Sequence, residues 1–185
     1  FSRLLEEKIR SEFQGENPNI SVHIIGFAKK VGDLIEGIVK VVMYFGIALL
    51  ITFVLLLIFT RCLKSSLITL ACSVIAVVWQ MGLLHTLGYG LDPYSILVPF
   101  LVFAIGISHG VQIINAMSIE SITADGAYTA ARRAFRSLYI PGMVALVSDG
   151  VGFATLLLIE IEVIRELGIA ASVGVGVIIL TNLVL

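Results

Sequence analysis

The sequence predicts an all-α membrane protein, and three observations lead to that fold class. Of the 185 residues, 58% are hydrophobic, which exceeds the roughly 45–50% of an average soluble domain. The mean hydropathy is +1.06. Several apolar segments are long enough for a helix to cross the hydrocarbon core, which takes about 20 residues. Only helices and closed barrels satisfy the backbone in lipid, and runs of this length are helical.

The residues before the first apolar segment are expected to lie outside the membrane. Residues 1–17 carry apolar side chains at helical spacing among charged ones, which predicts a solvated amphipathic helix. A Pro-containing break follows at 17–19, and residues 20–24 alternate apolar and polar side chains as a strand does. Residues 1–26 are therefore predicted to be a short βα piece of a soluble domain. Residues 27–40 are predicted to be an amphipathic entry helix at the membrane surface.

The transmembrane bundle is predicted to occupy residues 41–185. Its five spans are expected at 41–60, 67–87, 93–117, 138–159 and 167–185. A cytoplasmic linker at 118–137 separates the third span from the fourth, and its alanines favour a helix within it.

The loop charges predict the orientation of the bundle. Arg61 and Lys64 lie in one short loop, and Arg132, Arg133 and Arg136 lie in the linker, on the same side if all five segments span. The positive-inside rule places these loops in the cytoplasm and residues 1–26 outside, in the periplasm if the cell has one. We therefore expect a multi-pass membrane protein.

Several classes of function are disfavoured by what the sequence holds. The net charge is −1 and no basic stripe is present, which argues against a nucleic-acid partner. Cys62 and Cys72 are too far apart for a disulfide if they lie on helices. No nucleophilic triad, phosphate-binding loop or metal-ligand spacing is present, so we expect neither an enzyme nor a cofactor. The chain begins at Phe1 and stops in an apolar run at Leu185, and we expect it to be part of a longer protein.

Two ionisable residues within the predicted spans are the strongest indication of function. His109 lies inside 93–117, and Asp149 lies near the middle of 138–159. An ionisable group at membrane depth costs from about 3 to more than 10 kcal/mol, so it usually has a partner and a purpose. Imidazole changes charge close to neutral pH. These two residues are therefore predicted to be a proton relay.

Small and polar residues surround both candidates. Ser108, Gln112 and Asn115 share one face of a helix that His109 borders, and this polar face is expected to look into the bundle. Ser148 is a similar small polar residue beside Asp149. Glycines that permit close helix packing flank both sites: Gly106, Gly110, Gly150 and Gly152.

Three interpretations of the pair remain open on the residues alone. The helical rise puts His109 about 6 Å from the level of Asp149, within reach of the side chains or of one bridging water. The pair then carries protons, forms a static ion pair or hydrogen bond between two helices, or makes no contact at all.

Taken in order, a series of short motifs resembles the resistance–nodulation–division (RND) superfamily of permeases. The nearest branch is the lipid-exporter group, which includes mycobacterial lipid exporters, hopanoid transporters and the Patched and Niemann–Pick relatives. The resemblance covers roughly residues 20–185, as helices two to six of one repeat, and it is similar to a five-helix sterol-sensing domain. The motifs that carry it are Ile25-Gly26-Phe27, 104–110, 141–146, 152–157 and 166–170.

The resemblance implies a proton-driven exporter of a lipid or another hydrophobic compound in a bacterial inner membrane. It also implies that residues 1–26 are the end of a periplasmic, porter-like domain. It also implies a second repeat of the same permease, a periplasmic partner and a homo-oligomer as possible companions. Many relatives carry an Asp followed by Tyr or Phe in the fourth helix, where this chain has Ser108 and His109. Either Asp149 has taken over the relay on the next helix, or this repeat has lost coupling. The alternative function is a sterol- or lipid-sensing module that binds lipid without transport, and a third is a scaffold with a structural polar pair.

Overall fold

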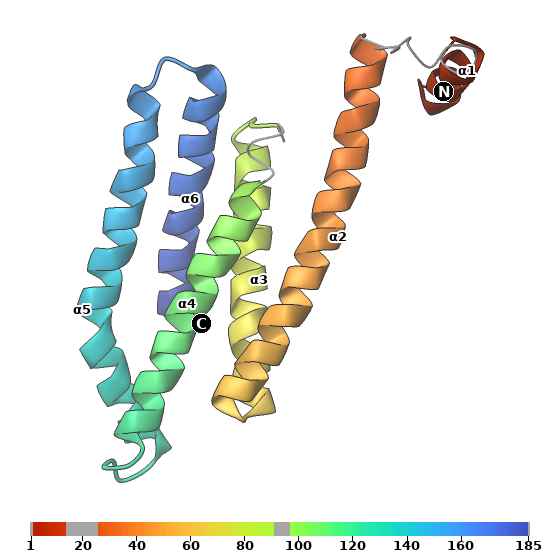
Figure 1. Cartoon of the computed structure of the whole chain (residues 1–185). Helices are drawn as coiled ribbons and strands as arrows, with labels where there is room; N and C mark the ends of the chain where they lie inside the picture. Colours follow the sequence, from red (N-terminus) through yellow and green to blue (C-terminus); the bar gives the residue numbers. More distant parts are fainter. Residues whose placement is uncertain (1, 14–25, 91–96, 185) are drawn as a thin grey trace. The chain divides into compact units, whose positions relative to one another are not determined.

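A computed structural model describes residues 2–13, 26–90 and 97–184, and these residues form helices only. The elements are α1 (Ser2–Phe13), α2 (Phe27–Thr60), α3 (Leu63–Thr86), α4 (Val98–Glu120), α5 (Ala127–Ala154), the 3-10 helix η2 (Thr155–Leu158) and α6 (Glu162–Val184) (Figure 1). The predicted strand within 20–24 lies outside the described residues. The chain forms two compact units, Phe1–Gly46 and Ile47–Leu185.

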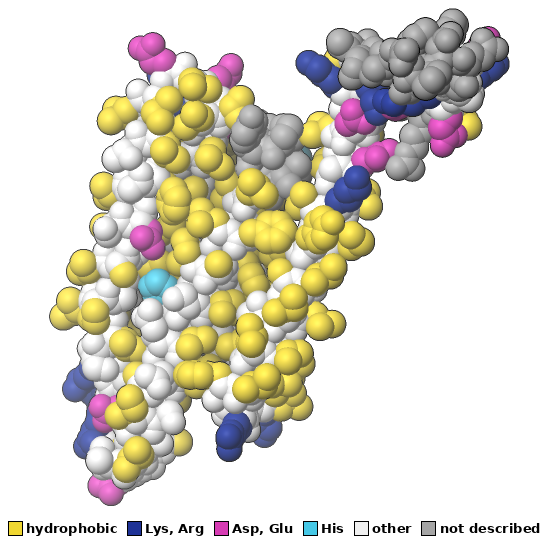
Figure 2. Space-filling view, viewed as in Figure 1, with side chains coloured by type: hydrophobic (Ala, Val, Ile, Leu, Met, Phe, Trp, Pro, Cys, Tyr) yellow, Lys and Arg dark blue, Asp and Glu magenta, His cyan; other side chains and the backbone are white. Residues whose placement is uncertain are grey.

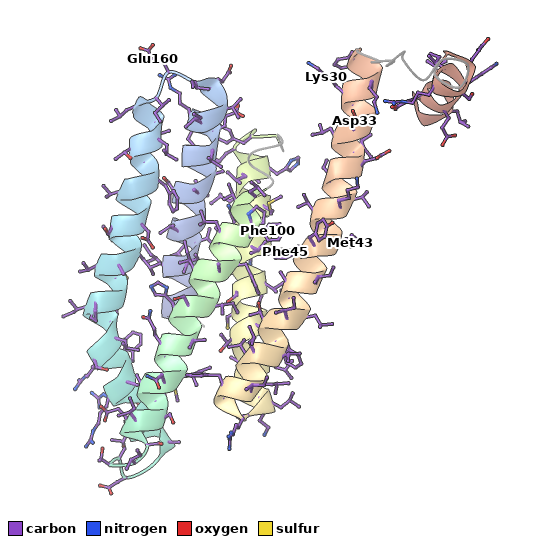
Figure 3. The ribbon with its side chains drawn as sticks, viewed as in Figure 1. Lys30, Asp33, Met43, Phe45, Phe100 and Glu160 are labelled. Carbon is purple, nitrogen blue, oxygen red and sulfur yellow. The ribbon has the colours of Figure 1, made fainter. Side chains whose placement is uncertain are left out.

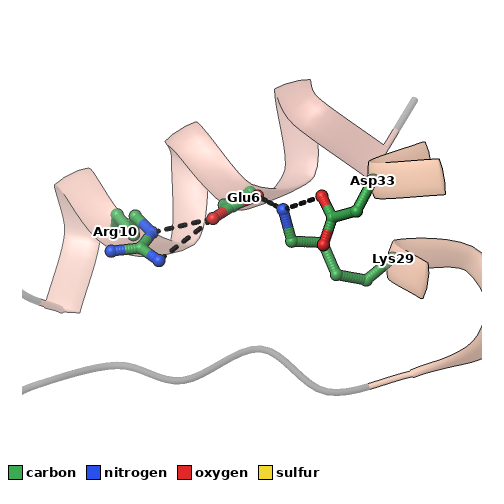
Figure 4. Close-up of polar contacts among 4 residues, drawn as sticks. All are labelled: Glu6, Arg10, Lys29 and Asp33. Atoms are coloured by element: carbon green, nitrogen blue, oxygen red, sulfur yellow. Dashed lines mark hydrogen bonds and ion pairs between the residues drawn. The ribbon is translucent and has the colours of Figure 1, made fainter. Parts of the chain in front are cut away.

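Four charged side chains connect α1 to the beginning of α2 in the first unit (Figure 4). The Lys29 ammonium lies 2.6 Å from Glu6 and 2.7 Å from Asp33, and Arg10 lies 3.0 Å from Glu6. These hydrogen bonds hold the pKa of Glu6 below its ordinary value, with the bond from Lys29 as the largest cause. The network therefore joins two elements that have little apolar surface to share.

The amphipathic segment and the first span are one uninterrupted helix. The sequence predicted a surface helix at 27–40 and a separate span at 41–60, whereas α2 runs through both with 34 residues. At about 1.5 Å per residue, such a helix is longer than the hydrocarbon core is thick, which is about 30 Å. No proline interrupts the segment, so nothing in the backbone separates the two parts.

In the second unit, α4 and α6 form the centre of the bundle. Each packs against the other and against both α3 and α5. The core consists of buried aliphatic, aromatic and small side chains from α2 to α6: Leu56, Ala76, Val77, Leu84, Val98, Val102, Phe103, Ala130, Ala134, Leu146, Ala170, Ala171, Val175, Val177 and Ile178. Glycine permits the closest approach on α6, because a Cβ at Gly174 would overlap the side chain of Val102. Van der Waals packing of this kind is the main attraction between helices in lipid.

The helices extend beyond the predicted spans at several ends. The fourth predicted span began at residue 138, but α5 begins at Ala127, so the predicted linker helix and the span are one element. Only 121–126 separate α4 from α5. The α2–α3 connection is shorter still and consists of residues 61–62. Within it, Arg61 adopts a left-handed backbone with φ of 49°.

Five helices are long and apolar enough to cross a membrane, which is the character of a multi-pass membrane protein. Charged side chains lie towards helix ends: Lys30 and Asp33 near the start of α2, and Glu160 where α5 turns towards α6 (Figure 3). Hydrophobic side chains cover most of the remaining surface in the space-filling view (Figure 2). An apolar exterior of this extent suits contact with lipid.

Candidate functional site

The rotation of α4 is fixed by its glycines. A Cβ at Gly106 would lie 3.0 Å from the Ser73 hydroxyl, and a Cβ at Gly110 would overlap the Thr69 methyl group. The backbone of α4 therefore packs directly on α3 along this face. Ser108 lies midway between the two glycines in sequence, so the helical period turns it to the opposite side.

The polar face of α4 consequently does not look into the bundle of described residues, as the sequence had suggested. Ser108, Gln112 and Asn115 are exposed. On α5, Ser148 and Asp149 are exposed as well. The physical reason is that close backbone packing, rather than polarity, decides which face of α4 turns inward. The polar residues instead form a flank on the outside of α4 and α5.

His109 lies at the edge of this flank, half-buried between α4 and α5. Its Nδ1 is 3.1 Å from the carbonyl oxygen of Ile105, one turn earlier on α4. The imidazole lines a cavity of about 60 Å³ between α4, α5 and α6, together with Gln112. The remaining lining is mainly apolar: Ile113, Phe135, Leu138, Tyr139, Gly142, Met143, Leu146 and Ile179.

Asp149 lies on the side of α5 that lines this cavity. Leu138, Gly142 and Leu146 line it at intervals of four residues, and Asp149 follows Leu146 by three. The periodicity of a helix puts these four residues on one face.

No polar interaction joins the two candidate relay residues. Within the described parts of the chain, His109 and Asp149 form neither an ion pair nor a hydrogen bond with each other. A bridging water or a change of rotamer is therefore required for proton transfer between them.

The flanking glycines differ in their surroundings. A Cβ at Gly150 would lie 3.7 Å from Val175 on α6, which is ordinary contact, and the hydroxyl of Ser172 donates to the Gly150 carbonyl at 3.4 Å. Gly152 is exposed, and a Cβ there would meet nothing within 4 Å. Gly150 therefore contributes to the α5–α6 interface, whereas Gly152 contacts no helix among the described residues.

A buried row of polar residues on α3 was missed by the sequence reasoning. Ser66, Thr69, Ser73 and Gln80 are all buried, and their spacing of three, four and seven residues puts them on one helical face. That spacing in an otherwise apolar segment is the signal that identifies them. The hydroxyl of Ser73 donates to the Thr69 carbonyl at 3.0 Å, a local bond common in membrane helices.

Gln80 differs from the hydroxyl residues because it connects two helices. Its side-chain amide donates to the carbonyl of Ala170 on α6 at 3.1 Å. Its Oε1 has no hydrogen-bond partner among the described residues. The amide is accommodated beside Gly174, where a Cβ would lie 3.0 Å from the Gln80 Nε2. Gln80 thus connects α3 to α6 through a buried hydrogen bond.

A wide apolar groove lies between the second half of α2 and the first half of α4. Its volume is about 590 Å³. One wall comes from 48–59 and the other from 100–111, and aromatic rings stand on both: Phe59, Phe100 and Phe103. A groove of this size without a charged lining residue suits a hydrocarbon ligand.

No protein-family model, curated protein or solved structure matches the chain.

Proposed function

We propose that the chain is the membrane part of a proton-coupled secondary transporter of the RND type, exporting a lipid or another hydrophobic compound. One observation carries the proposal: two titratable residues at membrane depth, His109 and Asp149, lie on neighbouring helices, and no ion-pair partner compensates either one among the described residues. Uncompensated groups of this kind are expensive and mark ion pathways.

The proposed coupling uses a change of charge at this flank. When Asp149 is ionised, its carboxylate faces surroundings of low polarity, which costs free energy. A proton bound to either Asp149 or His109 changes that free energy. Because α5 packs on both α4 and α6, a change in how Asp149 is solvated acts on the helix pair around the cavity. Alternating proton binding from the two membrane sides then drives alternating positions of the helices.

The groove between α2 and α4 supports a hydrophobic substrate. It is lined by apolar residues and Thr52, and its volume of about 590 Å³ lies within the range of small-molecule sites, which is about 300–1,000 Å³. A lipid in the membrane reaches such a groove laterally without crossing water.

The same groove favours a second candidate function, a sterol- or lipid-sensing module without transport. In that case the ligand occupies the groove, and the polar flank serves a signalling contact instead of proton movement. Transport requires titration of Asp149, whereas ligand binding in the groove does not. The two functions are therefore separable by one conservative substitution.

The test is an export assay on the intact protein in cells at matched membrane levels. Asp149→Asn and His109→Ala are each expected to abolish export while the protein still inserts. Asp125→Asn and His85→Ala are matched controls, because they make the same chemical changes at exposed residues outside the flank. Full export in both flank variants would overturn the proton-coupled function. Lipid binding that persists in wild type and Asp149→Asn, with no export by either, would establish the sensing module.

A further inference from the structure

One face of the first turns of α5 combines cations with aromatic rings. Arg132, Phe135, Arg136 and Tyr139 follow one another at intervals of three, one and three residues, which puts them on a single helical face. Both arginines are exposed, and the rings are 47% and 43% exposed for Phe135 and Tyr139. The ring centroids lie 5.4 Å apart. We call these four residues the Arg–aromatic face.

The arginines of this face are available for an anion. Arg133, which points elsewhere around the helix, lies 4.0 Å from Glu120 at the end of α4. Arg132 and Arg136 have no ion-pair partner in the parts of the chain that the structure describes. Two guanidinium groups one helical turn apart match the oxygens of a phosphate, which arginine binds through paired hydrogen bonds.

The position of the face along α5 suits a lipid headgroup. The apolar part of α5 starts at Leu138, directly after the arginines. Phe135 and Tyr139 therefore lie at the level where aromatic side chains favour the boundary between headgroups and hydrocarbon. Arginines at this level meet the phosphates of the same leaflet.

The cavity between α4, α5 and α6 continues directly from the two rings. Phe135 and Tyr139 form part of its lining, and Gly142 and Met143 follow on the same helix. The cavity exists partly because Gly142 has no side chain, since a Cβ there would meet nothing within 4 Å. Its volume of about 60 Å³ and mainly apolar lining suit a few methylene groups of one acyl chain better than a sterol ring system.

We propose that the Arg–aromatic face and this cavity together bind one anionic phospholipid of the adjacent leaflet. Arg132 and Arg136 hold its phosphate, the rings of Phe135 and Tyr139 contact its glycerol region, and the start of one acyl chain enters beside Gly142. This site is distinct from the groove between α2 and α4. It does not require that the protein transport protons or lipids.

The test measures phospholipid retained by the intact purified protein, using native mass spectrometry after exchange into mixed phosphatidylglycerol and phosphatidylcholine. Wild type is expected to retain phosphatidylglycerol preferentially. The double variant Arg132→Gln, Arg136→Gln is expected to bind it roughly tenfold more weakly. The matched control is Arg61→Gln, Lys64→Gln, which removes the same charge from exposed residues at the α2–α3 connection. Equal retention in the wild type and the Arg132, Arg136 variant, or an equal loss in the control, would overturn the site.

A second pair of variants tests the cavity. Gly142→Leu fills the cavity, whereas Gly152→Leu adds the same side chain to α5 at an exposed position with open space around it. Gly142→Leu is expected to reduce phosphatidylglycerol retention, and Gly152→Leu is expected to leave it unchanged. Displacement of the lipid by free glycerol 3-phosphate at equal concentration would overturn the proposal, because the cavity would then contribute nothing to binding. Export activity is not part of this readout, so the proposal and the proposed function fail separately.

Discussion

The thiol of Cys62 is expected to be the more reactive of the two free cysteines. Cys62 is exposed at the N-cap of α3, outside the spanning helices. A hydrogen bond from the backbone N–H of Ser65 is the largest cause that lowers its pKa below the ordinary 9.0, and Lys64 contributes as well. Because the thiolate is the nucleophile, a lowered pKa raises the reactive fraction near neutral pH.

Alkylation rates measure this effect directly. In the intact protein, Cys72→Ser leaves only Cys62 for iodoacetamide, and its rate is expected to reach a plateau at lower pH than that of a free thiol. Lys64→Gln is expected to shift the plateau to higher pH, since it removes a cation beside the sulfur. A rate profile identical to that of the SDS-unfolded protein would contradict the prediction.

At the scale of the helices, the glycine contacts of α4 are expected to determine stability. Gly110→Val places a branched side chain against Thr69, where even a Cβ overlaps a methyl group. Overpacking of this kind costs about 1–3 kcal/mol. Gly152→Val introduces the same residue at an exposed position on α5 with open space around it.

Thermal unfolding of the intact protein in detergent separates the two glycine variants. Gly110→Val is expected to lower the Tm well below that of wild type, while Gly152→Val changes it little. Equal Tm shifts in both variants would show that the α3–α4 contact at Gly110 is not the cause of the loss.

The connection of α1 to the start of α2 is expected to depend on pH. The pKa of Glu6 lies below its ordinary 4.5 because Lys29 and Arg10 hydrogen-bond its carboxylate. A carboxyl group whose folded pKa is lowered contributes stability above its unfolded pKa and loses it as the pH falls through the folded pKa. The connection is therefore expected to be intact at neutral pH and to loosen in acid.

Spin labels at Glu12→Cys and Lys40→Cys, with Cys62 and Cys72 replaced by Ser, report this change as a distance distribution. The distribution is expected to broaden in the parent protein once the pH falls through the lowered pKa of Glu6, and so at a lower pH than an ordinary glutamate titrates, which is about 4.3. Glu6→Gln is expected to broaden it already at neutral pH. Glu7→Gln, an exposed neighbour outside the ion-pair network, serves as the control. A narrow distribution for Glu6→Gln at neutral pH would contradict the role of the network.

Apolar run length predicted the spanning helices well, because lipid leaves the backbone few alternatives. It did not predict their ends. The apolar run at 138–159 begins after the last arginine of this helix, Arg136. Helix α5 begins earlier, at Ala127, because the preceding alanines and arginines also favour helical structure. The direction of the polar face on α4 was not predictable either. Either the polar face or the Gly106–Gly110 face of α4 could have packed inward from the sequence alone. The glycine face packs inward because the backbone of α4 there lies directly against Thr69 and Ser73 of α3.

At the scale of the whole molecule, the polar flank on α4 and α5 is expected to be covered by protein. Asp149, Ser148 and Gln112 are exposed within segments that are otherwise mainly apolar. A carboxylate facing lipid costs about 3 kcal/mol or more, and helices in membranes reduce such costs by hydrogen bonding to one another. Under the proposed function, the expected partner is a second repeat of the same permease or a second copy of the protein.

The arrangement of five spans makes a prediction about sidedness. Four crossings separate α1 from the α5–α6 turn, so both are expected on one side of the membrane, while the α4–α5 turn lies on the other. In a background without Cys62 and Cys72, Glu12→Cys and Glu160→Cys are expected to react with an impermeant maleimide from the same side. Thr123→Cys is expected to react only from the opposite side. The positive-inside rule assigns that opposite side to the cytoplasm, because Arg132 and Arg136 lie in the first turns of α5, which follows Thr123 in the chain. Labelling of Glu160→Cys and Thr123→Cys from one side would mean that α5 does not cross the membrane, and the exposed Asp149 would then face water.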